Sequence, residues 1–311
     1  MKTITIVVPT YNEEVNIIPA YEELTRVMNE EITGYNYEIM FVDNFSNDAT
    51  RGLIEMLCNK DQHVKAIFNA RNFGQMRSHF YGLTQAQGDC AILMHADLQN
   101  PPKVMVKFVE EWEKGSKVVI GIKDNSKENK IMFFLRSCYY KTMRKISDVE
   151  QIEHFSDFEL LDKDFIEVLR KLDDPLPYLR GIVSELGFRM SRIHYEQDKR
   201  ERGKSTANIH VLYDFAMLGI TSYSKSIMRL ATIFGFVLSG ISLLVALSTL
   251  IMKLINWNAF PMGVAAIGVG VFVLGSVQLF FIGFLGEYIL NMNIRIMHRP
   301  LVIEEKRINI E

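Results

Sequence analysis

The segment His95-Ala96-Asp97-Leu98-Gln99 has residue types and a spacing suited to binding a hard divalent cation. Asp97 offers a carboxylate directly after an apolar run, and Gln99 offers a second oxygen donor two residues further on. Mg²⁺ and Mn²⁺ prefer oxygen ligands and commonly share them with phosphate groups. A cation held here would neutralise and orient a diphosphate leaving group. The alternative is structural: Asp97 caps a helix that begins at Pro101-Pro102.

Three other polar clusters carry groups that suit a phosphorylated ligand. Thr10-Tyr11-Asn12-Glu13 and Asp43-Asn44 each follow an apolar run, and the segment Arg200-Glu201-Arg202-Gly203-Lys204-Ser205 is strongly basic. Arginine forks match phosphate oxygens, and a glycine lets the backbone turn close to a ligand. The alternatives are a solvated basic turn at 200–205 and, for Tyr11 and Glu13, a turn residue and a carboxylate in the first turn of a helix.

The elements that must position these residues alternate along the first 125 or so residues. Short apolar runs predict buried strands, and the segments between them predict helices. This alternation predicts an α/β fold with a mainly parallel sheet covered on both faces. Ligands of such sheets bind at the carboxyl ends of the strands, where the polar clusters lie. The predicted strands are Ile4–Pro9, Tyr37–Val42, Val64–Phe68, Cys90–Met94 and Val118–Ile122, and the predicted helices are Glu13–Met28, Ala49–Cys58, Gln75–Ala86 and Pro102–Lys114.

Composition excludes some classes of function. The chain has 311 residues and a net charge of −2, so its bulk charge predicts no nucleic-acid partner. Its three cysteines, Cys58, Cys90 and Cys138, are far apart and in no metal-ligand spacing. Isolated cysteines in odd number fit a reducing compartment and argue against a disulfide framework.

Two apolar segments near the C-terminus predict a pair of transmembrane helices. Leu230–Met252 holds 23 residues without a charge and Ala259–Gly286 holds 28, and about 20 apolar residues span a bilayer as a helix. Basic residues flank the pair on its outer sides, whereas the connecting loop carries one lysine, Lys253. Both flanks are therefore expected to face the cytoplasm. The alternative is two buried helices of a soluble core.

Two further segments have the pattern of helices that lie on a membrane surface. Lys130–Ile146 has an apolar side surrounded by five basic residues, which favours the headgroup layer. Asn208–Ser222 has a second apolar stripe, which fits packing against the sheet equally well.

Five segments follow one another in an order known from one enzyme family. They are Ile6-Val7-Val8-Pro9-Thr10-Tyr11-Asn12-Glu13-Glu14, Asp43–Thr50, Arg71-Asn72-Phe73-Gly74-Gln75, His95–Pro102 and Arg200–Ser205. In this order they resemble the motifs of family 2 glycosyltransferases of the GT-A fold. The two predicted spans make the chain similar to the polyprenyl-phosphate glycosyltransferases, the group that contains bactoprenol glucosyltransferases and dolichol-phosphate mannose synthase. The resemblance covers roughly residues 3–295.

The resemblance implies transfer of a sugar, with inversion, from a UDP- or GDP-linked donor to a polyprenyl phosphate such as undecaprenyl phosphate. It implies Mg²⁺ or Mn²⁺ bound by Asp97 and Gln99, and a mobile basic loop that closes over phosphates. Asp97, Asp157 and Arg202 are the implied catalytic residues. The implied nucleotide-sugar site consists of Pro9, Tyr11, Glu13, Asp43, Asn44, His95, Ala96, Asp97, Lys123, Arg200, Arg202 and Lys204.

The resemblance also implies an organisation of the chain. Residues 1–205 would form a cytosolic GT-A catalytic domain with an interfacial helix at about 130–146, followed by juxtamembrane amphipathic helices at 206–229. Transmembrane helices at about 230–252 and 262–286 would lie within 230–290, and residues 291–311 would form a cytosolic tail. The protein is accordingly expected in the plasma membrane as a multi-pass protein with both termini in the cytoplasm. Relatives often form oligomers, and small residues in the spans suit close helix packing, so a homo-oligomer is expected.

Two positions depart from the family pattern. The family usually has aspartate at the positions of His95 and Asn44, where these residues contact the ribose and the base. Histidine can exchange a hydrogen bond with a ribose hydroxyl, and the asparagine carbonyl can accept one from a base. The sugar and the nucleotide therefore do not follow from the resemblance, and a non-catalytic relative that binds lipid or nucleotide stays an alternative.

The expected acceptor explains why no general base is prominent. A phosphate monoester has a second pKa of about 6, so it is already a nucleophile at neutral pH. Catalysis is then expected to rest on positioning and on stabilisation of the leaving diphosphate. Asp157 matches an acidic position of the family and would orient the acceptor or its cations. Alternatively, Asp157 caps a helix within Ser156-Asp157-Phe158-Glu159.

Two further functions are disfavoured by the sequence. A polysaccharide synthase can use the same catalytic domain, but such enzymes carry a Gln-x-x-Arg-Trp motif that this chain lacks. A small-molecule transporter is disfavoured because the two predicted spans carry no charge.

Overall fold

We describe the protein from a computed structural model. The described residues are 1–124, 152, 155–172, 174–197, 217–218, 221–222, 233–237, single positions between 240 and 255, and 264–310. The predicted interfacial helix at 130–146, most of the second one at 208–222, most of the first predicted span and the basic segment 200–205 lie outside these residues.

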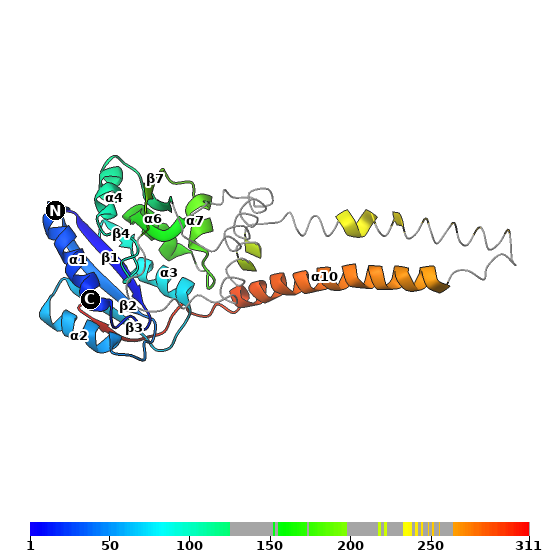
Figure 1. Ribbon diagram of the computed structural model, residues 1–311, viewed down its shortest axis with the longest axis horizontal. Coiled ribbons are helices and arrows are strands. Elements are labelled where there is room, and N and C mark those ends of the chain that lie inside the picture. Colours follow the sequence, from blue (N-terminus) through cyan, green and yellow to red (C-terminus); the bar gives the residue numbers. More distant parts are fainter. Residues whose placement is uncertain are drawn as a thin grey trace.

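The described part of the chain is built on an eight-stranded sheet (Figure 1). Its strands are β1 (Thr3–Thr10), β2 (Asn36–Asp43), β3 (Val64–Asn69), β4 (Cys90–Leu93), β5 (Val118–Lys123), β6 (Phe155–Asp162), β7 (Met190–Tyr195) and β8 (Glu304–Ile308). Their order across the sheet is β7-β5-β6-β4-β1-β2-β3-β8. β6 and β8 run antiparallel to their neighbours, and every other pairing is parallel.

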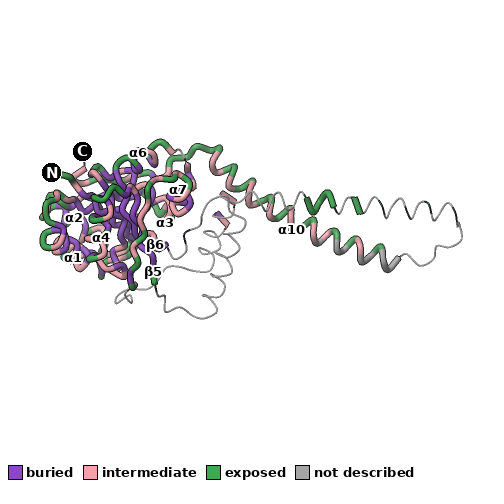
Figure 2. Tube along the Cα trace, turned by 90° about the horizontal axis from the view of Figure 1, so that it is seen from above, coloured by how far each residue is buried: buried purple, intermediate pink, exposed green. Residues whose placement is uncertain are grey.

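Helices cover both faces of the sheet and give three layers. They are α1 (Ile17–Glu30), α2 (Thr50–Lys60), α3 (Gln75–Gln85), α4 (Val104–Glu113), α6 (Lys163–Lys171) and α7 (Leu179–Glu185). One apolar cluster joins α1, α2 and α4 to one face of the sheet, and a second joins α3, α6 and α7 to the other. The buried residues are concentrated in this layered domain (Figure 2). The predicted α/β fold with a mainly parallel sheet is confirmed.

The central strand β1 shows why these strands are apolar throughout. Successive side chains of a strand point to opposite faces of the sheet. Ile4, Ile6 and Val8 accordingly pack into the cluster with α1, α2 and α4, whereas Val7 packs into the cluster with α3. A strand with helices on both sides therefore has few positions for polar residues until it ends.

The topology brings the ends of many strands to one edge. β1, β2, β3, β4, β5 and β7 all point the same way, so their carboxyl ends lie together. Antiparallel β6 contributes its amino end to this edge, because Ile122 near the end of β5 pairs with Phe155. This carboxyl edge is the expected place for a ligand.

One predicted boundary was wrong for a local reason. The first helix was expected from Glu13, but α1 begins at Ile17. Asn12 adopts a left-handed backbone with φ of 56°, and the backbone N–H groups of Asn12 and Glu13 donate to Ser46 and Thr50 in the loop after β2. Because these N–H groups are hydrogen-bonded to the loop after β2, the helix begins later, at Ile17.

A long helix leads away from the layered domain (Figures 1 and 2). This helix, α10 (Val264–Ile296), is the one helix among the described residues that is long and apolar enough to cross a membrane, with its apolar window at Val277–Ile296. Its apolar side chains are exposed, for example Leu279 at 71% and Phe280 at 64%. The helix continues past its predicted end at residue 286. The predicted two-helix hairpin is not confirmed, because most of its first helix lies outside the described residues.

The predicted cytosolic tail at 291–311 has regular structure, and its place in the cytosol stays a prediction. Its first residues belong to α10, and β8 returns to the layered domain and pairs with β3. Figure 1 shows this strand lying beside α2 and β3.

Candidate active site

The loops at the carboxyl edge are held in uncommon backbone conformations. Three non-glycine residues there have left-handed φ angles: Asn12 after β1 (56°), Phe45 after β2 (70°) and Leu98 after β4 (55°). Asp157, at the start of β6, has a φ of 51°. Such conformations cost free energy and tend to cluster at functional sites. The carboxyl edge is therefore the candidate active site.

The loops after β1 and β2 are bonded to each other. The Asn12 N–H donates to Ser46 Oγ over 2.8 Å, and the Asn47 N–H donates back to Asn12 Oδ1 over 2.9 Å. The Glu13 N–H donates to Thr50 Oγ1 over 2.9 Å. Pro9 is buried, and Tyr11 and Glu13 are half-buried beside this junction. The first two predicted motifs thus form one unit.

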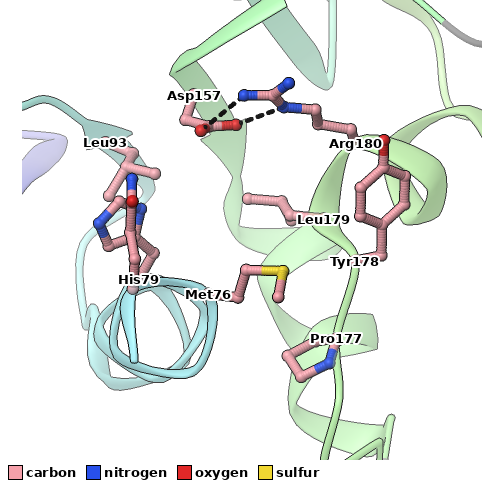
Figure 3. Close-up of a pocket in the computed structure, with 9 residues that line it drawn as sticks. Met76, His79, Leu93, Asp157, Pro177, Tyr178, Leu179 and Arg180 are labelled. Atoms are coloured by element: carbon pink, nitrogen blue, oxygen red, sulfur yellow. Dashed lines mark hydrogen bonds and ion pairs between the residues drawn. The ribbon is translucent and has the colours of Figure 1, made fainter. Parts of the chain in front are cut away.

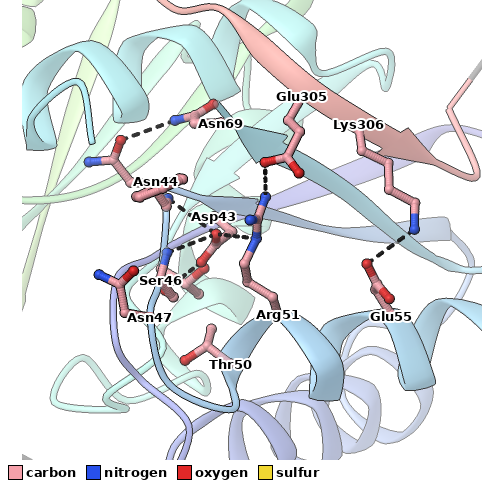
Figure 4. Close-up of polar contacts among 12 residues, drawn as sticks. Asp43, Asn44, Ser46, Asn47, Thr50, Arg51, Glu55, Asn69, Glu305 and Lys306 are labelled. Atoms are coloured by element: carbon pink, nitrogen blue, oxygen red, sulfur yellow. Dashed lines mark hydrogen bonds and ion pairs between the residues drawn. The ribbon is translucent and has the colours of Figure 1, made fainter. Parts of the chain in front are cut away.

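Asp43 organises the loop after β2 (Figure 4). Its side chain is fully buried, and its carboxylate accepts hydrogen bonds from the N–H groups of Phe45 and Ser46, both at 3.1 Å, and from the Ser46 hydroxyl. Arg51 Nε lies 3.3 Å from Asp43 Oδ2. Burial raises the pKa of Asp43, while the Ser46 hydrogen bonds and the Arg51 charge oppose that rise.

Asn44 connects the loops after β2 and β3. Its Oδ1 accepts from Asn69 Nδ2 at 3.1 Å and from the Phe73 N–H at 3.0 Å, and its Nδ2 donates to Asn72 Oδ1 at 3.0 Å. The side chain that was expected to meet a base therefore holds the Arg71–Gln75 motif in place. A contact between Asn44 and a nucleotide stays a prediction.

The predicted cation-binding segment follows β4 directly. The Gln99 N–H donates to Asp97 Oδ1 over 3.2 Å, and both residues are half-buried. Ala96 is buried and His95 is half-buried. The alternative role for Asp97 as a helix cap is wrong, because α4 begins at Val104 and its N-cap residue is Lys103.

The donor set suits a cation that is shared with a ligand. Among the described residues no group of three or more His, Cys, Asp or Glu side chains is placed to hold a metal ion. Mg²⁺ is commonly bound by one or two protein oxygens together with substrate phosphates. Asp97 and Gln99 provide one carboxylate and one amide oxygen for such a site.

Asp157 lies in β6 and forms an ion pair with α7 (Figure 3). Arg180 Nε donates to Oδ1 over 2.8 Å and Arg180 Nη2 to Oδ2 over 2.9 Å. Burial acts to raise the pKa of Asp157, but Arg180, with smaller contributions from His79 and His95, lowers it to about 2. The carboxylate is therefore ionised at neutral pH. The alternative that Asp157 caps a helix is wrong.

A small cavity lies beside this ion pair. Its volume is about 30 Å³, and it lies between residues of α3, β4, β6 and the segment leading into α7. The lining residues are Gln75, Met76, His79, Leu93, Asp157, Pro177, Tyr178, Leu179 and Arg180. The His79 ring lies 5.2 Å from the His95 ring, centroid to centroid. Burial and then His95 lower the pKa of His79 to about 3, so His79 is neutral.

Glu159 lies two residues from Asp157 and is fully buried. Neither of its carboxyl oxygens has a hydrogen-bond partner among the residues that the structure describes. Burial, reinforced by the charge of Asp157, raises the pKa of Glu159 well above its usual range. Burial therefore favours the protonated form of Glu159.

A group of basic residues lies where α10 meets the domain. Arg77, in the first turn of α3, is half-buried. Burial lowers the pKa of Arg77, and the like charges of Arg71 and Arg299 lower it further. Within the described residues Arg77 has no carboxylate partner. A cationic side chain beside like charges favours the binding of an anion.

The end of α10 reaches the carboxyl edge. Just after β3, the Ala70 N–H donates to Ile303 O over 2.9 Å. In the last turn of α10, Arg295 Nη2 lies 3.2 Å from Asp174 Oδ2. Asp174 comes a few residues before Pro177, which lines the cavity. The apolar helix and the candidate active site are therefore adjacent.

The structure brings most of the predicted residues to one edge. Those that lie there are Pro9, Tyr11, Glu13, Asp43, Asn44, His95, Ala96, Asp97, Gln99, Lys123 and Asp157. Arg200, Arg202 and Lys204 lie outside the described residues. Sequence reasoning missed His79 and Arg77, which belong to α3 and carry no local motif.

The chain is similar to known proteins over nearly its whole length. Residues 5–187 match the family described as "Glycosyl transferase family 2". The SfII prophage-derived bactoprenol glucosyl transferase of Shigella flexneri is 33% identical over 304 residues, which cover 97% of each chain. A prophage bactoprenol glucosyl transferase homolog of Escherichia coli (strain K12) is 32% identical over 96% of this chain and 97% of its own. An uncharacterized glycosyltransferase of Bacillus subtilis (strain 168) is 30% identical over 99% of this chain and 94% of its own.

Proposed function

The chain belongs to glycosyltransferase family 2, and from this premise we propose that it transfers a sugar from a nucleotide sugar to a polyprenyl phosphate. The observation that carries the proposal is the likeness to bactoprenol glucosyl transferases over 97% of both chains, at 33% identity. That likeness extends through α10, so it includes the part of the chain that would meet a lipid.

The placement of α10 supports a lipid acceptor. A helix with exposed apolar side chains, in the range of length that spans a bilayer, ends beside the carboxyl edge of the sheet. An acceptor whose polyprenyl tail lies in the membrane would have its phosphate at headgroup level, near Arg71, Arg77 and Arg299. We further propose that the site faces the cytoplasm and that residues 230–252 form a second span.

The donor nucleotide is proposed to lie along the joined loops after β1 and β2. Pro9, Tyr11 and Glu13 would line this pocket, and the loop that Asp43 organises would form its wall. His95 and Ala96 would border the ribose. Arg200, Arg202 and Lys204 are proposed to close over the donor phosphates, as arginine and lysine suit phosphate oxygens.

The proposed chemistry needs positioning more than proton transfer. The acceptor phosphate is already an anionic nucleophile. Mg²⁺ or Mn²⁺, when bound, would stabilise the leaving diphosphate, and Asp97 and Gln99 are the residues proposed to hold it. Asp157, kept ionised by Arg180, is proposed to orient the acceptor or its cations.

The test uses the full chain in detergent with undecaprenyl phosphate, Mg²⁺ or Mn²⁺, and a panel of labelled UDP- and GDP-sugars. We expect label from one donor to pass into the organic phase, which would identify the sugar at the same time. Folded protein that binds nucleotide but transfers no sugar to this acceptor would contradict the proposed acceptor. Absence of nucleotide binding would favour the alternative of a non-catalytic relative.

A further inference from the structure

The strand β8 completes the edge of the sheet next to β3. After α10 the chain passes His298, which has a φ of 44°, and then pairs antiparallel with β3. Ile308 pairs with Ala66, and Lys306 with Phe68. Asn309 Nδ2 donates to the carbonyl oxygens of Cys58 and Val64, both at 2.8 Å. The segment that follows the apolar helix is thus bonded to α2 and β3.

One side chain of β8 connects with the loop after β2 (Figure 4). Glu305 Oε2 lies 2.7 Å from Arg51 Nη2. Arg51 Nε in turn lies 3.3 Å from Asp43 Oδ2. Arg51, in the first turn of α2, therefore bridges a carboxylate of the C-terminal strand and the buried carboxylate that organises the loop.

Arg51 also packs on the loop itself. Its guanidinium lies 5.8 Å from the centroid of the Phe45 ring and 5.1 Å from that of Phe68. Phe45 is the residue with the left-handed backbone in this loop. The position of the guanidinium therefore affects both the charge of Asp43 and the backbone conformation of Phe45 in the loop after β2.

Glu305 restricts where that guanidinium can lie. The Arg51 side chain is 25% exposed, whereas that of Asp43 is fully buried. An arginine bound at one end only keeps much of its rotamer freedom, whereas an arginine held by two carboxylates in different directions is largely fixed. Without Glu305, Arg51 can turn towards solvent and leave the buried Asp43 charge less compensated.

We propose that Glu305 is a positioning residue for the donor nucleotide and acts through Arg51 on the loop formed by residues 43–48. The inference rests on the proposed function, in which this loop borders the nucleotide. It assigns to the C-terminal strand a part in donor binding in addition to closing the sheet. Because β8 follows α10 directly, the membrane helix and the donor pocket are linked by a short covalent path.

A neighbouring ion pair provides a matched control. Lys306 Nζ lies 3.1 Å from Glu55 Oε1, so it also joins β8 to α2. The exposures match, at 52% for Lys306 and 53% for Glu305. The Lys306–Glu55 pair has no contact with Asp43 among the described interactions. Replacing Lys306 thus removes an equivalent β8–α2 contact without disturbing the bridge.

The experiment measures the binding of UDP and of GDP to the full chain in detergent by calorimetry, for wild type, Glu305→Gln and Lys306→Gln. We expect Glu305→Gln to raise the Kd of the nucleotide that binds by about three- to tenfold, and Lys306→Gln to leave it unchanged. In the Arg51→Gln background, Glu305→Gln should have no further effect. In transfer assays the donor KM should rise while kcat stays within about twofold.

The outcomes separate this inference from the proposed function. If wild type binds a nucleotide and Glu305→Gln binds it equally well, the positioning role is overturned while the proposed function stands. Equal weakening by Glu305→Gln and Lys306→Gln, with equal losses in Tm, also overturns it, because β8 would then act only through stability. If wild type binds neither UDP nor GDP, both proposals are overturned.

Discussion

Arg180 holds Asp157 by two parallel hydrogen bonds, from Nε to Oδ1 at 2.8 Å and from Nη2 to Oδ2 at 2.9 Å. A fork of this kind fixes both the charge and the orientation of the carboxylate. Among the described residues, His79, His95 and Glu159 are titratable groups that also affect Asp157 or lie beside it. The pair therefore controls the electrostatics at the start of β6.

The first prediction concerns pH. The pKa of Asp157 is lowered from 3.8 to about 2, so the stability that its carboxylate contributes is present above about pH 4 and is lost as the pH falls towards 2. In Arg180→Gln, burial remains and the cation is gone, so the pKa should rise. We expect kcat/KM to fall with decreasing pH by up to about tenfold per pH unit, in a range where wild type stays active.

Arg180→Lys serves as the conservative comparison, since it keeps the charge without the fork. We expect it to recover part of the wild-type pH profile. Superimposable profiles for wild type and Arg180→Gln would show that the ionisation of Asp157 does not depend on Arg180.

The second prediction concerns Glu159. Its pKa is raised by burial, so the unfolded chain ionises more readily than the folded one. Wild-type stability should therefore decline as the pH rises above the unfolded-state value and towards the folded one. Glu159→Gln removes this dependence at little change in shape. At pH 8 we expect the Tm of Glu159→Gln to exceed that of wild type by roughly 2–4 °C for each kcal/mol gained in the free energy of unfolding. Near pH 4.5 the two Tm values should match.

Neutralising Asp162, on the same strand, should have the opposite effect on the Tm. Asp162 accepts from Trp112 Nε1 at 2.7 Å and pairs with Lys117 at 2.9 Å. Asp162→Asn should lower the Tm at pH 8. A lower Tm for Glu159→Gln as well would contradict a raised pKa for Glu159.

The third prediction concerns Asp97. If this carboxylate holds the cation, Asp97→Asn should lower transfer by about 100-fold or more while the protein stays folded. Asp89 is a suitable control, because it lies at the opposite end of β4 and accepts a hydrogen bond from the Thr3 N–H at 2.8 Å. Asp89→Asn should keep its activity. Wild-type transfer by Asp97→Asn would remove Asp97 from the metal site.

The fourth prediction concerns Arg77. An arginine that meets the acceptor phosphate makes charge-assisted hydrogen bonds, so Arg77→Gln should raise the KM for the lipid by about tenfold or more. The Kd of the donor nucleotide should not change. Lys107→Gln, on the exposed side of α4, is the control. An unchanged lipid KM in Arg77→Gln would place the acceptor phosphate elsewhere.

Much of the fold could be predicted from the sequence because its signals are local. The strands from β1 to β5 are apolar runs, and their polar motifs come directly after them. Parallel strands then bring these motifs to one edge without further information. Tyr11, Asp43 and Asp97 were placed at this edge in this way.

β6 and β8 were missed for different physical reasons. β6 carries three acidic residues, Asp157, Glu159 and Asp162, so it does not have the pattern of an apolar run. It also follows β5 after a long segment and runs antiparallel to it. β8 consists of Glu304-Glu305-Lys306-Arg307-Ile308, and charged edge strands have little apolar periodicity. His79 and Arg77 were missed because tertiary packing alone brings them to the site. Their positions depend on how α3 packs on the sheet.

The fifth prediction tests how α3 is placed, since this helix carries His79. A Cβ atom at Gly82 would lie 2.8 Å from Val7 Cγ1 and 2.9 Å from Val42 Cγ2. Gly82 thus lets α3 approach β1 and β2 closely. Gly82→Ala should destabilise the protein by about 1–3 kcal/mol, because the helix must move away from the sheet, and activity should fall as His79 shifts.

Gly52 lies in α2 with nothing within 4 Å of its added Cβ, so Gly52→Ala should stabilise by about 0.4–1 kcal/mol. Denaturant unfolding of both variants measures the contrast, and equal stability of the two would show that contact with the sheet does not require glycine at position 82.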